Sequence, residues 1–248
     1  NRFTKICGNY GSPGLARNAA FSNLESEWIM FLDADDSFRI EKVVSFIRNG
    51  HVTNKDLIVF SYDVKDFNSQ EMIRSINAAG LFSKSKFVFE IGLWRLLIRV
   101  SAIKSTRFNN LKWAEDQLFI ADILRKSDLR ISYQKEITYL YLTGQKQQLT
   151  ANRKNLPSLN QALEMYLGFF RQINLVKQRS FIYALFIRTY ISWLKNAQFT
   201  LENVYLFLKV AIRGLLLSKG RVLLGVPFIV CGINIFKIEN RKRRKNIE

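Results

Sequence analysis

Apolar residues follow two different spacings along the chain, which predict helices in some segments and strands in others. Between residues 13 and 24 they recur as on one face of a helix, and Ser12 followed by Pro13 is a typical helix start. Residues 28–32 are instead a short unbroken apolar run, which is typical of a strand covered on both faces. Polar residues directly after position 32 are therefore expected at the carboxyl end of a buried strand, where open α/β sheets bind ligands.

The remaining pattern separates an α/β part from a helical part. Before residue 150 it predicts a helix at 40–47, a strand at 56–62, a loop or hairpin at 63–86, a helix at 114–124 and two short strands within 129–142. Helices are then predicted at 159–173, 180–195 and 201–217. We therefore expect an α/β domain over residues 1–150, followed by a helical region over residues 151–248.

Three aspartates, Asp33, Asp35 and Asp36, lie within four positions directly after the apolar run. Carboxylates crowded at the end of a buried strand repel one another and are costly to desolvate. Such a group is usually retained because a cation binds there, and a hard divalent ion with oxygen ligands suits it best. The turn after residue 32 is therefore a candidate metal site.

The segment 14–36 resembles the signature of glycosyltransferase family 2. It reads G-x-x-x-A-R-N, a spacer, W-I-x-F-L and then D-x-D-D. Two further family landmarks lie downstream, the pair of Glu115 and Asp116 and the Tyr-Leu-Tyr strand at 139–141. Over residues 1–150 the resemblance implies a GT-A fold, in which a Rossmann-related sheet binds a nucleotide-sugar.

The resemblance implies roles for the D-x-D-D turn and the A-R-N helix. Asp35 would coordinate Mg²⁺ or Mn²⁺, which neutralises charge on the donor diphosphate as the sugar–phosphate bond breaks. Asp33 would contact the ribose or the donor sugar, and Asp36 would support the turn. Arg17 and Asn18 would bind the nucleotide-sugar, since a guanidinium can clamp phosphate or stack on a base. The residue types alone leave two alternatives, an aspartate turn that caps the next helix and a surface arginine.

On the acceptor side, the resemblance implies that Asp116 is the general base that takes the acceptor hydroxyl proton. Its place at a helix start is expected to favour the ionised form, and the alternative is a carboxylate that only stabilises the helix dipole. Glu115 is expected to assist acceptor binding. Trp94 and Trp113 are candidates to stack on sugar rings, with packing in the core or a loop as the alternative, whereas His51 is expected to be an ordinary surface residue.

Family members place a βαβ unit before the A-R-N helix, whereas this chain reaches that helix at residue 14. We therefore expect a fragment that lacks the strand and acidic turn which hold the uridine base. A divergent short member of the family is the alternative. Such a fragment is expected to be inactive, to dissolve poorly and to show negligible UDP affinity until upstream sequence is restored.

Positive charge is concentrated in the helical region. Residues 1–150 hold 21 Lys or Arg and 16 Asp or Glu, a net charge of +5, whereas residues 151–248 hold 17 and 4, a net charge of +13. The predicted helix at 201–217 is apolar with a narrow basic edge, and the apolar stretch 222–236 is shorter than the roughly 20 residues of a membrane span. A basic run at 241–245 follows. These features predict peripheral or monotopic binding to an anionic membrane surface.

We therefore predict a metal-dependent, inverting glycosyltransferase of the hexosyltransferase type. The donor would be a nucleotide-diphosphate sugar of the UDP type, and the acceptor a saccharide or a lipid-linked saccharide. By analogy with the family, the product would be a bacterial surface polysaccharide such as capsule, O-antigen or exopolysaccharide, made at the cytoplasmic face of the inner membrane. Two alternatives stay open, a catalytically dead membrane scaffold and a basic nucleic-acid-binding protein, although no nucleic-acid motif is present and no nucleic-acid partner is expected.

Overall fold

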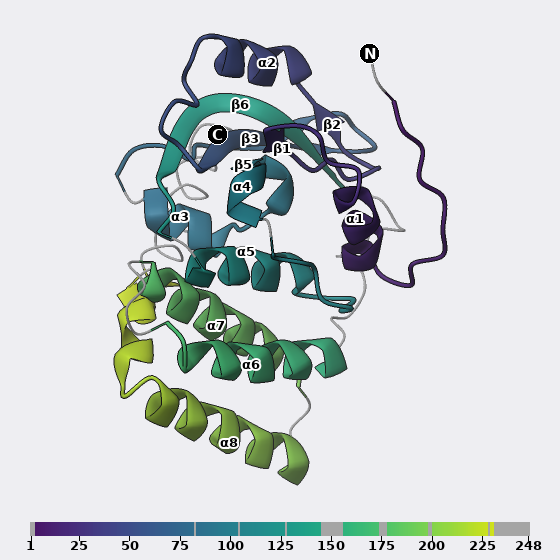
Figure 1. Ribbon diagram of the computed structural model, residues 1–248. Coiled ribbons are helices and arrows are strands. Elements are labelled where there is room, and N and C mark those ends of the chain that lie inside the picture. The colour runs from purple at the N-terminus through teal and green to yellow at the C-terminus, as the bar shows by residue number, and fades with distance from the viewer. Residues whose placement is uncertain are drawn as a thin grey trace, which may run out of the picture.

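The computed structural model describes residues 3–81, 83–103, 105–126, 128–144, 156–173, 178–197, 200–227 and 229–230. Its helices and strands form stacked layers (Figure 1). A mixed β-sheet lies between α2 (Ile40–Arg48) on one face and α5 (Glu115–Lys126) on the other. Beyond α5 lie α6 (Leu156–Phe170) and α7 (Arg179–Leu194), and α8 (Leu201–Leu217) forms the outermost layer.

The sheet contains six strands in the described part of the chain, β1 (Trp28–Ile29), β2 (Ser37–Phe38), β3 (Leu57–Asp66), β4 (Met72–Ile76), β5 (Leu96–Arg99) and β6 (Ile131–Thr143). Their order is β1-β5-β3-β6-β2, and β4 pairs with the second half of β3. The long strands β3 and β6 run parallel, whereas the other pairs are antiparallel. The central position of β3 explains why its residues are the most deeply buried of any strand.

Shorter elements connect these layers: α1 (Pro13–Phe21), α3 (Ser83–Phe89), η1 (Leu93–Arg95), α4 (Val100–Ile103) and η3 (Arg221–Gly225). The predicted start of α1 is confirmed, because Ser12 Oγ accepts a hydrogen bond from the Leu15 N–H at 3.4 Å and Pro13 opens the helix.

Alternate residues of β3 enter two different cores. Leu57 and Val59 belong to the larger core, which continues through α5 into α6 and α7, whereas Ile58 and Phe60 pack beneath α2. Full burial of one such side chain stabilises the fold by about 1.5–3 kcal/mol. Because the larger core is continuous, the helical region is packed onto the sheet region through shared apolar contacts.

The structure confirms an α/β class with a helical C-terminal region, but two predicted strands differ. The run 28–32 was expected to be a strand buried on both faces, yet β1 has two residues at the edge of the sheet and Leu32 is 54% exposed. Residues 28–31 do pack on both faces, with Ile29 and Phe31 in the larger core and Trp28 and Met30 beneath α2. The expectation is wrong in the length of the strand, because only Trp28 and Ile29 pair with β5. Residues 129–142 form one strand rather than two, since β6 stays paired to β3 through register shifts near Ser61.

Candidate active site

The A-R-N helix is fastened to the segment that leads into α5. The Asn18 amide forms two hydrogen bonds with the Phe108 backbone, donating to the carbonyl oxygen and accepting from the N–H, each at 2.8 Å. A Cβ at Gly14 would lie 2.9 Å from the Asn109 carbonyl oxygen, so the close approach of α1 requires glycine. Two residues of the signature therefore fix the position of α1 relative to α5.

The residue before α5 has a strained backbone. Ala114 is buried and has a φ of 66°, in the left-handed region that a residue with a Cβ rarely adopts. Its carbonyl oxygen accepts a hydrogen bond from the Leu118 N–H at 3.0 Å, so the first turn of α5 begins here. Such strain, about 1–3 kcal/mol, persists where surrounding structure enforces it and clusters at functional sites. The left-handed conformation of Ala114 is followed directly by Glu115 and Asp116, the first two residues of α5.

One cleft of about 660 Å³ collects most of the predicted site residues: Arg17, Asp33, Asp35, Trp94, Trp113, Glu115 and Asp116. They come from α1, the D-x-D-D turn, η1 and the start of α5. The helical region completes the lining with Leu159 of α6 and with Arg188 and Ser192 of α7. Segments far apart in the sequence thus form a single concave site whose carboxylates come from two of them, the D-x-D-D turn and α5.

Arg17 connects the two groups of carboxylates. Its guanidinium donates to Asp33 Oδ1 and to Glu115 Oε1, each at 3.1 Å. The guanidinium carbon also lies 5.4 Å from the centre of the Phe108 ring, which holds it by a cation–π contact. The D-x-D-D turn and the start of α5 are therefore joined through one cation at the edge of the cleft.

The last aspartate of the turn is bound to strand β6. Tyr139 donates its hydroxyl to Asp36 Oδ2 at 2.7 Å, and the Leu142 N–H donates to Asp36 Oδ1 at 2.8 Å. The Asp33 N–H in turn donates to the Tyr139 hydroxyl at 3.3 Å. Burial raises the pKa of Asp36 to about 6, and these hydrogen bonds oppose the rise. The contacts hold the turn in place and leave Asp35 exposed at the cleft.

The carboxylates at the start of α5 have perturbed ionisation. Burial, followed by the negative charge of Asp116, raises the pKa of Glu115 to about 7, and the Arg17 guanidinium opposes the rise. Burial also raises the pKa of Asp116, against the attraction of Arg188 and a hydrogen bond from the Gln117 N–H at 2.7 Å. The expectation that the helix start favours ionised Asp116 is therefore wrong in its net direction, because desolvation outweighs the local dipole.

Aromatic rings form one wall of the cleft. Trp94 stacks on Tyr139, with ring centroids 4.3 Å apart, and on Tyr141 at 5.7 Å, and the ring of Tyr62 meets it edge-on. Trp94 and Tyr141 line the cleft, and Trp113 lines it from the segment before α5. A flat apolar wall beside hydrogen-bonding groups suits a sugar ring, whose two faces carry C–H groups.

Two of the predicted site residues, Asn18 and Asp36, do not line the cleft, because their polar atoms support α1 and the turn.

Arg188 lines the cleft, although the sequence pattern did not predict it as a site residue. It is the single charged residue between positions 180 and 194, and this isolation within an apolar helix is the signal that could have identified it. Its Nε donates to the Phe89 carbonyl oxygen at 3.1 Å. His51 lies outside the cleft, where its ring packs on Phe46.

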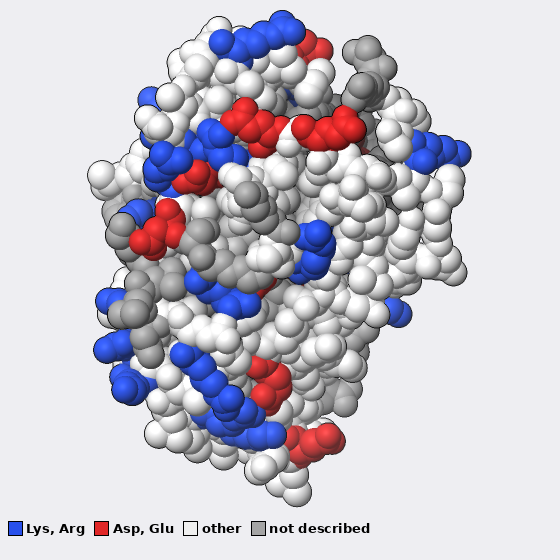
Figure 2. Space-filling model, in the orientation of Figure 1, with Lys and Arg blue, Asp and Glu red and all other residues white. Residues whose placement is uncertain are grey.

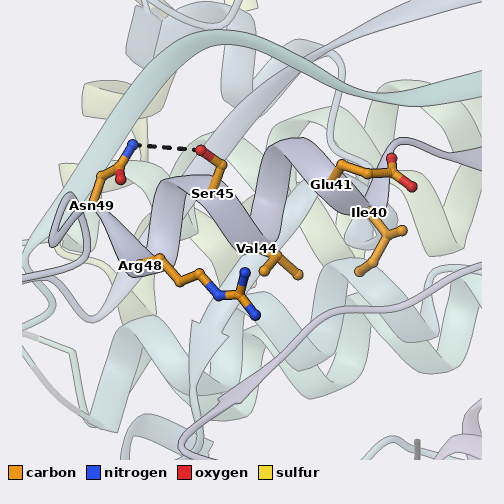
Figure 3. Close-up of a pocket in the computed structure, with 6 residues that line it drawn as sticks. All are labelled: Ile40, Glu41, Val44, Ser45, Arg48 and Asn49. Carbon is orange, nitrogen blue, oxygen red and sulfur yellow. Dashed lines mark hydrogen bonds between the residues drawn. The ribbon is translucent and has the colours of Figure 1, made fainter.

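A second, smaller hollow lies along α2 and has no part in this site (Figure 3). Its lining comes from one helix: Ile40, Glu41, Val44, Ser45, Arg48 and Asn49. No second element contributes a side chain, and none of the predicted site residues is among them. We therefore regard it as a feature of the helix surface.

Residues 8–114 match the family model for glycosyl transferase family 2. The resemblance to glycosyltransferase family 2 is confirmed. The matched segment includes the A-R-N helix and the D-x-D-D turn and ends directly before Glu115.

Poly(ribitol-phosphate) beta-glucosyltransferase of Bacillus spizizenii (strain W23) is 28% identical over 141 residues, which are 54% of this chain and 22% of that protein. The chain thus spans about a fifth of the length of this curated relative.

Crystal structures of S. aureus TarS share the fold. The complex with UDP-GlcNAc has a TM-score of 0.65 and 18% sequence identity, covering 98% of this chain and 75% of that one. The complex with UDP has a TM-score of 0.61 and 18% identity, covering 97% and 73%. This likeness confirms the expected GT-A-like sheet and the helical region after it.

Proposed function

We propose that the protein transfers a sugar from a nucleotide-diphosphate donor to an acceptor hydroxyl with inversion at the anomeric carbon. The observation that carries this proposal is the shared cleft, whose lining includes the exposed Asp35 of the turn together with Glu115 and Asp116 of α5. A transferase needs one group to hold the donor diphosphate and a second group to activate the acceptor. Family 2 membership of residues 8–114 supports the same chemistry.

The donor is a UDP-sugar in this proposal. Two of the TarS structures contain UDP-GlcNAc or UDP, and their fold matches nearly the whole chain. Within the cleft, Arg17 is hydrogen-bonded to Asp33, two positions before the exposed Asp35. We propose that the sugar of a donor held at Asp35 contacts Trp94 or Tyr141, which line the same cleft.

The donor set at Asp35 fits Mg²⁺ or Mn²⁺. The described residues contain no cluster of three or more His, Cys, Asp or Glu side chains that could enclose a metal ion. Mg²⁺ commonly binds proteins through one or two carboxylates and takes its remaining ligands from substrate phosphates and water. Asp35, exposed at the cleft, would supply such a carboxylate. The ion would neutralise charge that develops on the diphosphate.

Asp116 acts as the general base. Its carboxylate accepts the proton of the acceptor hydroxyl while that oxygen attacks the anomeric carbon, and the bond from this carbon to the diphosphate oxygen breaks with its electron pair. The products are the glycoside, with inverted configuration, the nucleoside diphosphate and protonated Asp116. Burial raises the pKa of Asp116, which makes it a stronger base than an ordinary aspartate, and the charge of Arg188 opposes this rise.

The acceptor we propose is a polymer of the bacterial cell surface that carries hydroxyl groups. The B. spizizenii relative is named for poly(ribitol-phosphate), a polymer with both hydroxyls and phosphates. Lys112, exposed at the cleft beside Trp113, offers a cation to an acceptor of this kind. A saccharide acceptor would instead rely mainly on Trp94 and Trp113.

The experiment is a transfer assay with the full-length protein that contains this chain, UDP-sugars, poly(ribitol-phosphate) and Mn²⁺. We expect UDP release together with a new glycosidic bond whose anomeric configuration, read by NMR coupling constants, is opposite to that of the donor. A retained configuration would contradict the role of Asp116. UDP release without acceptor would show hydrolysis and contradict the acceptor proposal.

A further inference from the structure

The outermost helix carries an apolar stripe that faces solvent. Leu201, Tyr205, Leu208, Ile212 and Leu215 follow one another at spacings of four and three residues along α8, and they are between 43% and 91% exposed. The opposite face of the helix is in the core, where Val210 is buried and a Cβ at Gly214 would lie 3.2 Å from the Phe186 ring. The stripe is therefore the face of α8 turned away from the protein.

The exposed apolar surface continues beyond α8. Leu223 and Leu224 of η3 are 60% and 47% exposed, and Leu216 at the end of α8 is 70% exposed. The turn η3 is held against α7, because a Cβ at Gly225 would lie 2.5 Å from the Ala184 backbone nitrogen. Two elements that follow one another in the chain thus both present apolar side chains to solvent, and we call these side chains together the α8–η3 face.

Basic residues accompany this face. Lys209, Arg213, Lys219 and Arg221 lie on α8 and the turns after it, against a single acidic residue there, Glu202. Arg213 forms an ion pair with Glu164 of α6 at 2.7 Å. Figure 2 shows Lys and Arg gathered at the lower end of the molecule, along the outer helices. An apolar patch with a basic border is the pattern of a helix that lies in a membrane interface.

We propose that the α8–η3 face docks on an anionic lipid bilayer, with its leucines at the level of the acyl chains and its basic side chains at the headgroups. Charge complementarity favours this occupant over a second copy of the chain, because two copies would bring like-charged borders together. The described residues include no helix that is long and apolar enough to cross a bilayer. The contact that we propose lies at the bilayer surface. Residues 228 and 231–236 of the predicted anchor at 222–236, and the whole basic run at 241–245, lie outside the described residues.

The test measures binding of the full chain to phosphatidylcholine vesicles with and without phosphatidylglycerol, by cosedimentation. We expect binding that requires phosphatidylglycerol and weakens with salt. The double substitution Tyr205→Glu and Leu216→Glu should lower the partition coefficient by about tenfold or more. The matched control is Leu81→Glu, which changes another exposed leucine, 81% exposed, outside the face and should bind as the unmodified chain does.

Two results would overturn the proposal: undiminished binding by the folded double variant, or sedimentation velocity showing a dimer that the double variant breaks while vesicles are not bound. Should circular dichroism show that the double variant is unfolded, Tyr205→Trp gives an independent measurement. A blue-shifted emission that brominated lipid quenches supports docking through α8, and an emission unchanged by phosphatidylglycerol vesicles contradicts it. None of these measurements requires glycosyl transfer, so the two proposals can fail separately.

Discussion

The D-x-D-D turn and the start of α5 bring carboxylates to the same cleft but surround them differently. Asp35 is exposed at the cleft, whereas the Glu115 side chain is only 12% exposed and its pKa is raised to about 7. The turn follows an edge strand and is held by Tyr139, while Glu115 and Asp116 follow the strained Ala114 and are covered by α7.

The difference in exposure suits the carboxylates of the turn and those of α5 to different functions. An exposed carboxylate can share a cation with phosphate oxygens, whereas a desolvated carboxylate near a like charge holds a proton more tightly and can exchange one with substrate. Arg17 lies between the two groups and contacts both. We therefore propose donor binding at the turn and acceptor activation at α5.

The largest effect is expected from Asp35→Asn. Loss of the carboxylate that we propose to bind the metal should lower transfer by about 10³-fold or more, because several kcal/mol of charge stabilisation on the leaving diphosphate would be removed. Steady-state rates over a Mn²⁺ titration measure it in the full-length protein. Asp128→Asn, at an exposed aspartate outside the cleft, is the control. Near-normal, chelator-sensitive turnover in Asp35→Asn would show that another group holds the metal.

Asp116→Asn should lower kcat by roughly 10²-fold or more, the scale of general-base catalysis, while donor affinity stays close to that of the unmodified enzyme. Amide and carboxylate have nearly the same shape, so the fold should persist, which circular dichroism can verify. If donor affinity falls and turnover is unchanged, Asp116 belongs to the binding part of the cleft instead.

A smaller effect is expected on the pH profile. Because burial raises the pKa of Glu115 to about 7 and also raises the pKa of Asp116, activity should fall as the pH drops and these carboxylates take up protons. Glu115→Gln removes the neighbouring negative charge, so the midpoint of this fall should move to lower pH by roughly one unit. Arg188→Gln removes a positive charge instead, and should move the midpoint of the fall in activity to higher pH. Equal shifts in one direction would contradict the electrostatic account.

The same pair predicts a trend in stability. Since the folded protein binds the Glu115 proton more tightly than the unfolded chain, its contribution to the free energy of unfolding is full below the ordinary value of 4.5 and is lost as pH rises through about 7. Urea unfolding at several pH values should show a loss over this window that Glu115→Gln reduces. An unchanged pH dependence in that variant would place the proton elsewhere.

The smallest expected effect concerns the joint between α1 and α5. Gly14→Ala forces a Cβ against the Asn109 carbonyl oxygen and should lower the free energy of unfolding by about 1–3 kcal/mol. Gly168→Ala is the control, since Gly168 is exposed in α6 with no atom near its added Cβ, and it should stabilise by about 0.5–1 kcal/mol. Thermal denaturation compares them, and equal melting temperatures would contradict the close approach.

Elements whose apolar pattern is local could be predicted from the sequence. The helices α1, α2, α5, α6, α7 and α8 are all present near their predicted ranges, because the buried face of a helix is encoded within a few turns. Strands depend on partners elsewhere in the chain. The edge position of β1 and the continuous pairing of β6 with β3 follow from contacts about 70 residues apart, which no local spacing records.

The candidate site was predictable where a motif names its residues. Arg17, Asp33, Asp35, Glu115 and Asp116 meet in one cleft. The supporting contacts of Asn18 with Phe108 and of Asp36 with Tyr139 join positions 90 and 103 residues apart, so they required the fold. Arg188 comes from a helix without a motif, and its place beside Asp116 depends on how α7 packs on α5.

Calorimetry of UDP binding in the presence of Mn²⁺ tests the division between the turn and α5 most directly. In the full-length protein, Asp116→Asn should bind UDP within about threefold of the unmodified affinity, and Asp35→Asn should bind at least about tenfold more weakly and lose its dependence on Mn²⁺. The reverse pattern, or equal losses in both variants, would contradict the assignment of donor binding to Asp35 and of acceptor activation to Asp116.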